Sequence, residues 1–101
     1  MEEKQGEDRD DEEGRSAQTS YNTIDLRGHG LDEAQIDLDA FIDGALEMGI
    51  EEVYVIHGHG TGVLKTGLRR YLRHLKKVES FRPGKRGEGG DGITVVKLRS
   101  E

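Results

Sequence analysis

Two short segments of the 101-residue chain hold side chains suited to chemistry on phosphate groups. The first runs Asp25-Leu26-Arg27-Gly28, and the second begins at His57. His57 can act as a general acid or base near neutral pH, and Arg27 can stabilise the charge that develops on a phosphodiester in the transition state. Asp25 can orient either side chain, or can serve only as a turn or capping residue. These residue types favour phosphodiester cleavage, with a hydrogen-bonded structural histidine as the alternative for His57.

The second segment is also a glycine-rich turn of the kind that binds anions. It reads His57-Gly58-His59-Gly60-Thr61-Gly62. Glycine reaches positive φ and lets a ligand approach the backbone closely, and the helix expected to follow directs free N–H groups and its positive dipole end at the turn. The turn is neither a Walker motif nor a dinucleotide-binding fingerprint. We therefore expect it to contact phosphate without binding a nucleotide in either of those ways.

The pair formed by His57 and His59 has a spacing that metals can use. The chain has no cysteine, and no further histidine near this pair completes a coordination shell. The sequence therefore predicts no structural metal site.

Hydrophobic periodicity predicts the elements that position these segments. The expected strands are 21–26, 52–56, 78–82 and 93–98, the expected helices are 31–48 and 63–75, and a mobile glycine-rich loop is expected over 85–92. The order β-α-β-α-β-β gives an α/β fold class. Strands separated by helices are expected to pair in parallel, and the last two strands are expected to be antiparallel.

Parallel pairing would bring the two chemical segments to the same edge of the sheet. Asp25 and Arg27 close the first strand, and His57 closes the second. Ligands of open α/β sheets bind outside the carboxyl ends of the strands. Lys65, in the second helix, would join them there.

Charge is distributed unevenly along the chain, whose formal net charge is −6. Residues 1–15 carry −5, residues 16–62 carry −8, and residues 63–86 carry +8. Within the basic segment, one helical stripe and the following loop supply candidate phosphate contacts: Lys65, Arg69, Arg73, Lys76, Lys85 and Arg86. A solvated helix face is the alternative for this stripe, and a nucleic-acid surface is the hypothesis it supports.

Residues 1–20 are predicted to be a disordered acidic tail, and residues 21–101 one folded domain. The first 15 residues contain eight acidic side chains and no aromatic or branched aliphatic residue, so they cannot bury enough apolar surface to offset the entropy lost on ordering. No apolar run approaches 18 residues, which predicts no membrane span. No secretion signal follows the acidic start, so a cytoplasmic location is expected.

Four motifs together resemble the Smr (small MutS-related) domain over Thr23 to Leu98. They are Asp25-Leu26-Arg27-Gly28, Asp32-Glu33-Ala34, the glycine-rich turn 57–62, and the run 87–96 that reads GEGGDGITVV. The form is most similar to the C-terminal domain of type-two MutS proteins. This resemblance implies a two-layer sandwich similar to the C-terminal domain of bacterial translation initiation factor three. It also implies nicking endonuclease activity on DNA or structured RNA, with a non-catalytic module that binds DNA, RNA or a ribosome as the alternative.

The resemblance also assigns roles to individual residues. The family's motif positions are occupied by Asp25, Arg27, His57, Gly58, Gly60 and Gly62. Lys65 stands where a basic residue is usual, and Glu33 is a further candidate acid. His29-Gly30 and His59 depart from the usual pattern, which bears on metal dependence and substrate fit. A divalent Mg²⁺ or Mn²⁺ ion is the candidate cofactor, and the chain is a candidate fragment of a larger MutS-like ATPase.

Overall fold

A computed structural model describes residues 18–99. Most of the predicted tail, 1–17, therefore lies outside the described residues. The described part contains four strands, β1 (Thr23–Asp25), β2 (Glu52–Ile56), β3 (Val78–Pro83) and β4 (Ile93–Leu98); two α-helices, α2 (Leu31–Glu47) and α3 (Val63–Arg73); and two short 3₁₀ turns, η1 (Arg86–Glu88) and η2 (Gly90–Gly92). The predicted order of helices and strands is confirmed.

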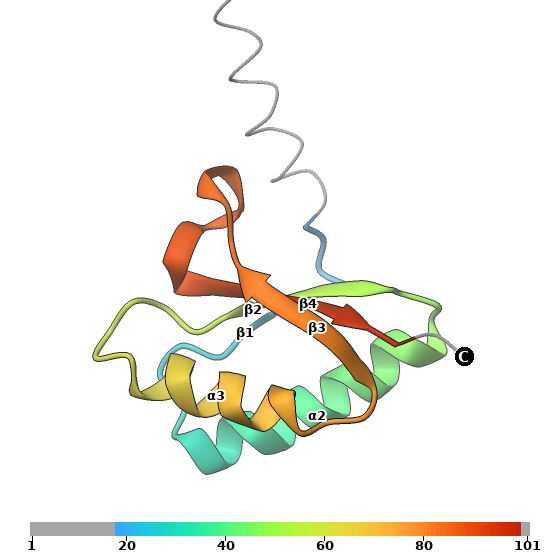
Figure 1. The fold of residues 1–101 in the computed structure, drawn as a ribbon, viewed down its shortest axis with the longest axis horizontal. Helices are drawn as coiled ribbons and strands as arrows, with labels where there is room; N and C mark the ends of the chain where they lie inside the picture. The colour runs from blue at the N-terminus through green and yellow to red at the C-terminus, as the bar shows by residue number, and fades with distance from the viewer. Residues whose placement is uncertain (1–17, 100–101) are drawn as a thin grey trace, which may run out of the picture.

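The four strands form one mixed sheet in the order β1-β2-β4-β3 (Figure 1). β1 and β2 are parallel, as predicted, and β4 pairs antiparallel with β3, also as predicted. The expectation that β2 and β3 would pair is wrong, because β4 lies between them and is antiparallel to both. A short connection after β3 lets the chain reverse, so the last strand takes an inner place between β2 and β3.

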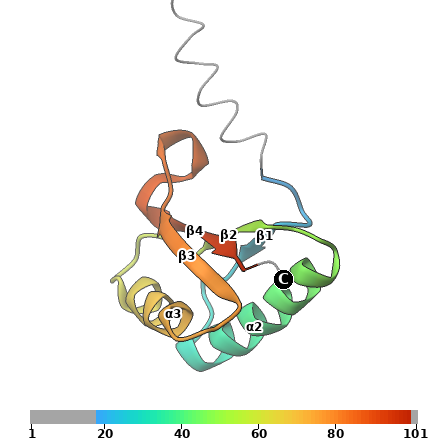
Figure 2. The same ribbon diagram turned by 45° about the vertical axis from the view of Figure 1, so that its right-hand side comes forward.

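Both helices cover the same face of the sheet (Figures 1 and 2). α2 contributes Ala34, Leu38 and Ile42 to the core, and these side chains are fully buried against the sheet and α3. The opposite face carries a smaller apolar cluster that includes Tyr54 and Val95. Each buried aliphatic side chain stabilises the fold by about 1.5–3 kcal/mol, so this two-layer arrangement fixes the helices relative to the sheet edge.

The connection between β3 and β4 is more structured than the mobile loop predicted over 85–92. Its first turn, η1, ends at Glu88, whose side chain is only 6% exposed. The Glu88 carboxylate accepts hydrogen bonds from Arg82 Nη1 and Nη2 at 2.8 and 3.0 Å and from the Lys85 backbone N–H at 2.8 Å. Gly84 has no room for a side chain, because an added Cβ would lie 2.2 Å from Ile93 Cγ2 and 2.8 Å from the Gly90 carbonyl oxygen.

α3 ends at Arg73, two residues before the predicted end. Lys76 and Lys77 therefore lie in the turn that leads into β3. Lys77 forms ion pairs with Asp39 and Asp43 of α2. The acidic helix α2 thus neutralises one base of the positive segment and is held against the end of α3.

Candidate functional site

The register of β1 and β2 brings the two predicted chemical segments together. Asp25 is paired with Ile56, and the Leu26 N–H donates to the Ile56 carbonyl at 2.7 Å. Arg27 and His57 therefore leave the sheet at the same edge. A Cβ added to Gly58 would lie 3.2 Å from Arg27 Cγ, so the arginine stem lies directly beside the glycine-rich turn.

Asp25 and Arg27 form a two-point ion pair. Arg27 Nε donates to Asp25 Oδ1 at 3.0 Å, and Arg27 Nη2 donates to Oδ2 at 2.7 Å. The Arg27 hydrogen bonds lower the pKa of Asp25 to about 2, so the carboxylate is ionised at any physiological pH. The Arg27 side chain is still 63% exposed, and Nη1 takes no part in the pair. The carboxylate thus orients a guanidinium that faces solvent.

His57 is buried, with 5% of the residue exposed. Its Nδ1 lies 3.0 Å from the Gly58 carbonyl oxygen, and its Nε2 lies 2.8 Å from Thr94 Oγ1. Because a carbonyl oxygen only accepts, Nδ1 carries the proton and Nε2 accepts from the Thr94 hydroxyl in the neutral ring. Burial lowers the pKa of His57, and the nearby positive charges of Arg69 and Lys65 lower it further.

Arg69 reaches the same buried group from α3. Its Nε donates to Thr94 Oγ1 at 2.9 Å, which leaves the Thr94 proton free to bond His57. The Arg69 Nη2 atom is buried and has no hydrogen-bond partner among the described residues. Arg69 therefore lies behind the turn, between α3 and β4, and supports His57 from there.

The glycine-rich turn is attached to the start of β4. The N–H groups of His57 and Gly58 both donate to the Gly92 carbonyl, at 3.1 and 2.9 Å. Gly58 and Gly62 have φ values of 81° and 87°, a region that side chains with a Cβ rarely adopt. The turn is thus held at its base, while Gly60 and Thr61 at its tip are exposed.

Two hollows flank this turn. One, of about 480 Å³, is lined by Arg27, His59 and Arg86 together with the backbone around Gly58 and Gly89. The other, of about 310 Å³, is lined by His29, His57, His59 and Lys65 among others. His59 is the histidine that borders both hollows and is exposed, and its ring lies against Gly92. The edge thus presents an arginine and an imidazole to one shared space.

Three members of the predicted basic stripe contact other parts of the fold. Lys65 forms an ion pair with Asp91 of η2 at 2.6 Å, Arg69 bonds Thr94, and the Arg73 guanidinium lies 5.7 Å from the centre of the Phe81 ring. Exposed bases of the positive segment are Arg70, Arg73, Lys76, Lys85 and Arg86. Lys65 and Arg69 are the members of the stripe that are partly withdrawn from solvent.

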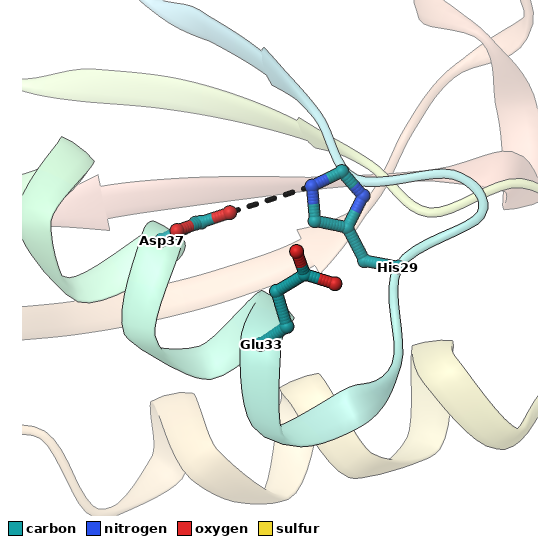
Figure 3. A group of neighbouring side chains, drawn as sticks. All are labelled: His29, Glu33 and Asp37. Atoms are coloured by element: carbon teal, nitrogen blue, oxygen red, sulfur yellow. Dashed lines mark ion pairs between the residues drawn. The ribbon is translucent and has the colours of Figure 1, made fainter.

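Among the predicted site residues, Lys76 lies at the opposite end of the sheet from His57, where its carbonyl accepts from Arg99 Nε at 2.8 Å. Glu33 also lies apart from His57. It is exposed in the first turn of α2, next to His29 and Asp37 (Figure 3). His29 Nε2 lies 3.4 Å from Asp37 Oδ2. These three residues were not predicted to lie together. Their spacing of four, with two on one helix face, was the available signal.

The fold and this edge define a small two-layer α/β domain whose polar groups gather at the carboxyl ends of two parallel strands. Residues 24–99 match the Smr domain family, and the chain belongs to that family.

Bacterial MutS2 proteins share this domain. Over 78 residues the chain is 50% identical to the endonuclease MutS2 of Caldanaerobacter subterraneus subsp. tengcongensis and 51% identical to that of Clostridioides difficile, covering 77% of this chain in each case. It spans about a tenth of the length of those relatives.

Solved structures agree with the fold. The Smr domain of Thermus thermophilus MutS2 is 42% identical, with a TM-score of 0.75 over 77% of this chain and 98% of that one. YdaL, a stand-alone small MutS-related protein from Escherichia coli, matches with a TM-score of 0.76 over 81% of this chain and 67% of that one, at 24% identity, and supports the fold alone. Within residues 18–99, no helix is long and apolar enough to cross a membrane.

Proposed function

We propose that this Smr domain binds nucleic acid at the edge formed by Arg27 and the glycine-rich turn, and nicks the phosphodiester backbone there. The substrate is duplex or branched DNA, or structured RNA. The observation that carries the proposal is the exposed Arg27 guanidinium, fixed by Asp25 beside a hollow that His59 and Arg86 also line. The name endonuclease, borne by the MutS2 relatives, supports the same chemistry.

Arg27 would bind the non-bridging oxygens of the reacting phosphate. A guanidinium matches phosphate geometry through paired N–H donors, and Nη1 is not used by Asp25. Because Asp25 holds the group before substrate arrives, little ordering entropy is lost on binding. Such a donor stabilises charge that increases in the transition state.

His57 is the proposed general base, but its hydrogen bonds must change before it can act as one. Its lowered pKa keeps the ring neutral at pH 7, as a base requires. Its Nε2, however, already accepts the Thr94 hydroxyl at 2.8 Å inside the protein. To take a proton from water or a 2′-hydroxyl, the ring must leave Thr94 and the turn must open. His59 is the second candidate for the base, because it is exposed and lines the same hollow as Arg27.

The second candidate function is a binding module without catalysis, acting on DNA, RNA or a ribosome. The burial of His57 favours this candidate, because an imidazole bonded at both nitrogens positions the turn rather than reacting. Membership of a larger MutS-like ATPase is a further proposal that fits either function. In that setting the domain would deliver its binding edge to nucleic acid held by the rest of the protein.

One assay separates the two functions. Purified protein is incubated with supercoiled plasmid and with structured RNA, in Mg²⁺, in Mn²⁺ and in chelator. Nicking that decreases by at least about 10² in His57→Ala, with binding retained, supports His57 as the base. The same loss in His59→Ala instead moves the base to His59. Binding without nicking by the parent protein in every metal condition establishes the binding module.

A further inference from the structure

The turn after β1 and the first two turns of α2 bring one imidazole and two carboxylates together. His29, Glu33 and Asp37 each offer a ligand atom, and these atoms all lie within 4.8 Å of one another (Figure 3). We propose that these three side chains bind one divalent transition-metal ion of the zinc or manganese type. The inference rests on this cluster alone and is independent of the proposed nicking activity.

The backbone arranges the three ligands before any ion arrives. Gly28 takes a φ of 86°, and the His29 N–H donates to the Leu26 carbonyl at 3.1 Å, which closes a tight turn. α2 begins directly afterwards at Leu31. Glu33 and Asp37 are four residues apart, so they lie one above the other on the same helix face. The turn places the His29 ring beside that face, as Figure 3 shows.

The orientation of the His29 ring favours a cation between it and Asp37. Nδ1 lies 3.4 Å from the Arg27 carbonyl oxygen, which can only accept a hydrogen bond, so Nδ1 carries the proton. In a neutral ring, Nε2 then holds a lone pair 3.4 Å from the Asp37 carboxylate oxygen. Two lone pairs repel unless a positive charge lies near both. Metal-binding histidines commonly donate their other ring N–H to a backbone carbonyl in the same way.

The donor set also indicates the class of ion. Within residues 18–99, Glu33 forms no ion pair and Asp37 pairs only with His29. A neutral imidazole with two carboxylates carries two negative charges, which a divalent ion neutralises. The imidazole favours zinc and similar metals over Mg²⁺ or Ca²⁺, which prefer oxygen ligands, while the carboxylates suit manganese. Three protein ligands leave room for water at the ion.

The helix dipole explains only one member of this cluster. An acid in the first turn is stabilised by the helix dipole, which accounts for Glu33 but not for Asp37 one turn later or for the imidazole beside both. Ligand atoms bound to one zinc ion lie about 3.4 Å apart, so the three must draw together slightly from 4.8 Å. Glu33 and Asp37 are exposed, and His29 is partly exposed, so their rotamers can adjust without disturbing the core.

An ion here would stabilise the turn that carries Arg27. His29 is two residues after Arg27 and borders the hollow shared with His57 and Lys65. Binding to the folded state alone raises its stability in proportion to the logarithm of ion concentration. The melting temperature of the parent protein should therefore increase with added Zn²⁺ or Mn²⁺.

The test uses the full chain, freed of metal with chelator and dialysed. Mn²⁺ binding is followed by electron paramagnetic resonance and Zn²⁺ binding by calorimetry. We expect one saturable site, a shift of the His29 Nε2 resonance on Zn²⁺ binding, and a rise in melting temperature. His29→Ala and Asp37→Asn should each lower affinity by at least about tenfold, since even indirect metal contacts are worth that much.

The matched controls are Asp32→Asn, which removes the same charge as Asp37→Asn but from the first turn of α2, and His59→Ala, which removes a neighbouring imidazole. Both should bind as the parent does, and circular dichroism checks that every variant folds. Equal affinity in His29→Ala and the parent would overturn the site. So would non-saturable binding alone, which would mean that His29 and Asp37 form a simple ion pair. Neither outcome depends on whether the protein nicks nucleic acid.

Discussion

At the scale of single residues, Arg27 and His57 end neighbouring strands but occupy opposite environments. Arg27 is exposed and fixed by a carboxylate on its own strand, whereas His57 is buried and bonded to Thr94, which is 37 residues later in the chain. The first arrangement suits contact with a charged ligand. The second suits holding a turn in place. It also couples the protonation of His57 to folding, because the ring is buried only in the folded protein.

Replacing Arg27 should affect rate more than affinity. We predict that Arg27→Ala lowers nicking by about 10²–10³, the usual effect of removing one transition-state donor, and weakens binding modestly. Asp25→Asn should cause a smaller loss, because the guanidinium remains but is no longer fixed by an ion pair. The measurement is a single-turnover nicking time course with binding measured in parallel. Unchanged rates in Arg27→Ala would contradict the role given to this edge.

The buried His57 should make the domain less stable in mild acid. Its folded-state pKa is lowered below the ordinary value of 6.5, so the unfolded chain binds the proton more tightly. Stability is therefore fully present above that value and decreases as pH falls through and below it. We predict that the free energy of unfolding in urea decreases from pH 7 to pH 5, and that His57→Gln removes part of this slope. An identical slope in the variant would show that His57 titrates freely.

At the scale of elements, some positive side chains of α3 and the segment after it contact other elements, whereas others are exposed to solvent. Lys65, Arg69 and Arg73 contact η2, β4 and β3 respectively, so they join the helix to the sheet edge. Lys85 lies outside the helix, next to Arg86 of the hollow, and is exposed. Lys76 is also exposed, but it lies at the opposite end of the sheet, where its carbonyl accepts a hydrogen bond from Arg99. Charge reversal should therefore have different consequences at these two kinds of position.

We predict that Lys85→Glu weakens nucleic-acid binding while leaving stability unchanged. Each lost phosphate contact should reduce the slope of log affinity against log salt by about 1. Arg69→Glu should instead lower the free energy of unfolding, because it places a carboxylate beside the Thr94 hydroxyl in a nearly closed site. Lys97→Glu, at the far end of β4, is the matched control and should bind normally. Binding that is insensitive to Lys85→Glu at moderate salt would place the surface elsewhere.

At the scale of the whole molecule, the predicted and observed structures agree where local hydrophobic periodicity determines the element. The residues 52–56 form β2 with the predicted bounds, and the parallel pairing that joins Arg27 to His57 follows from the helix between their strands. The central place of β4 was missed, because pairing between distant strands leaves no local periodicity. The burial of His57 could not be predicted for the same reason, because Thr94 and Arg69, which contact it or its partner, come from other elements. The cluster of His29, Glu33 and Asp37 depends on the turn at Gly28.

The measurement that tests the central claim most directly is a map of the binding surface. Labelled protein is titrated in chelator, where metal-dependent cleavage cannot proceed, with a short DNA duplex and with a structured RNA, and amide shifts are followed by NMR. We predict that the largest changes fall at Arg27, at 58–62 and at 85–86, with little change along the outer face of α2. Changes centred on α2, or on the far end of the sheet around Lys97, would contradict this prediction.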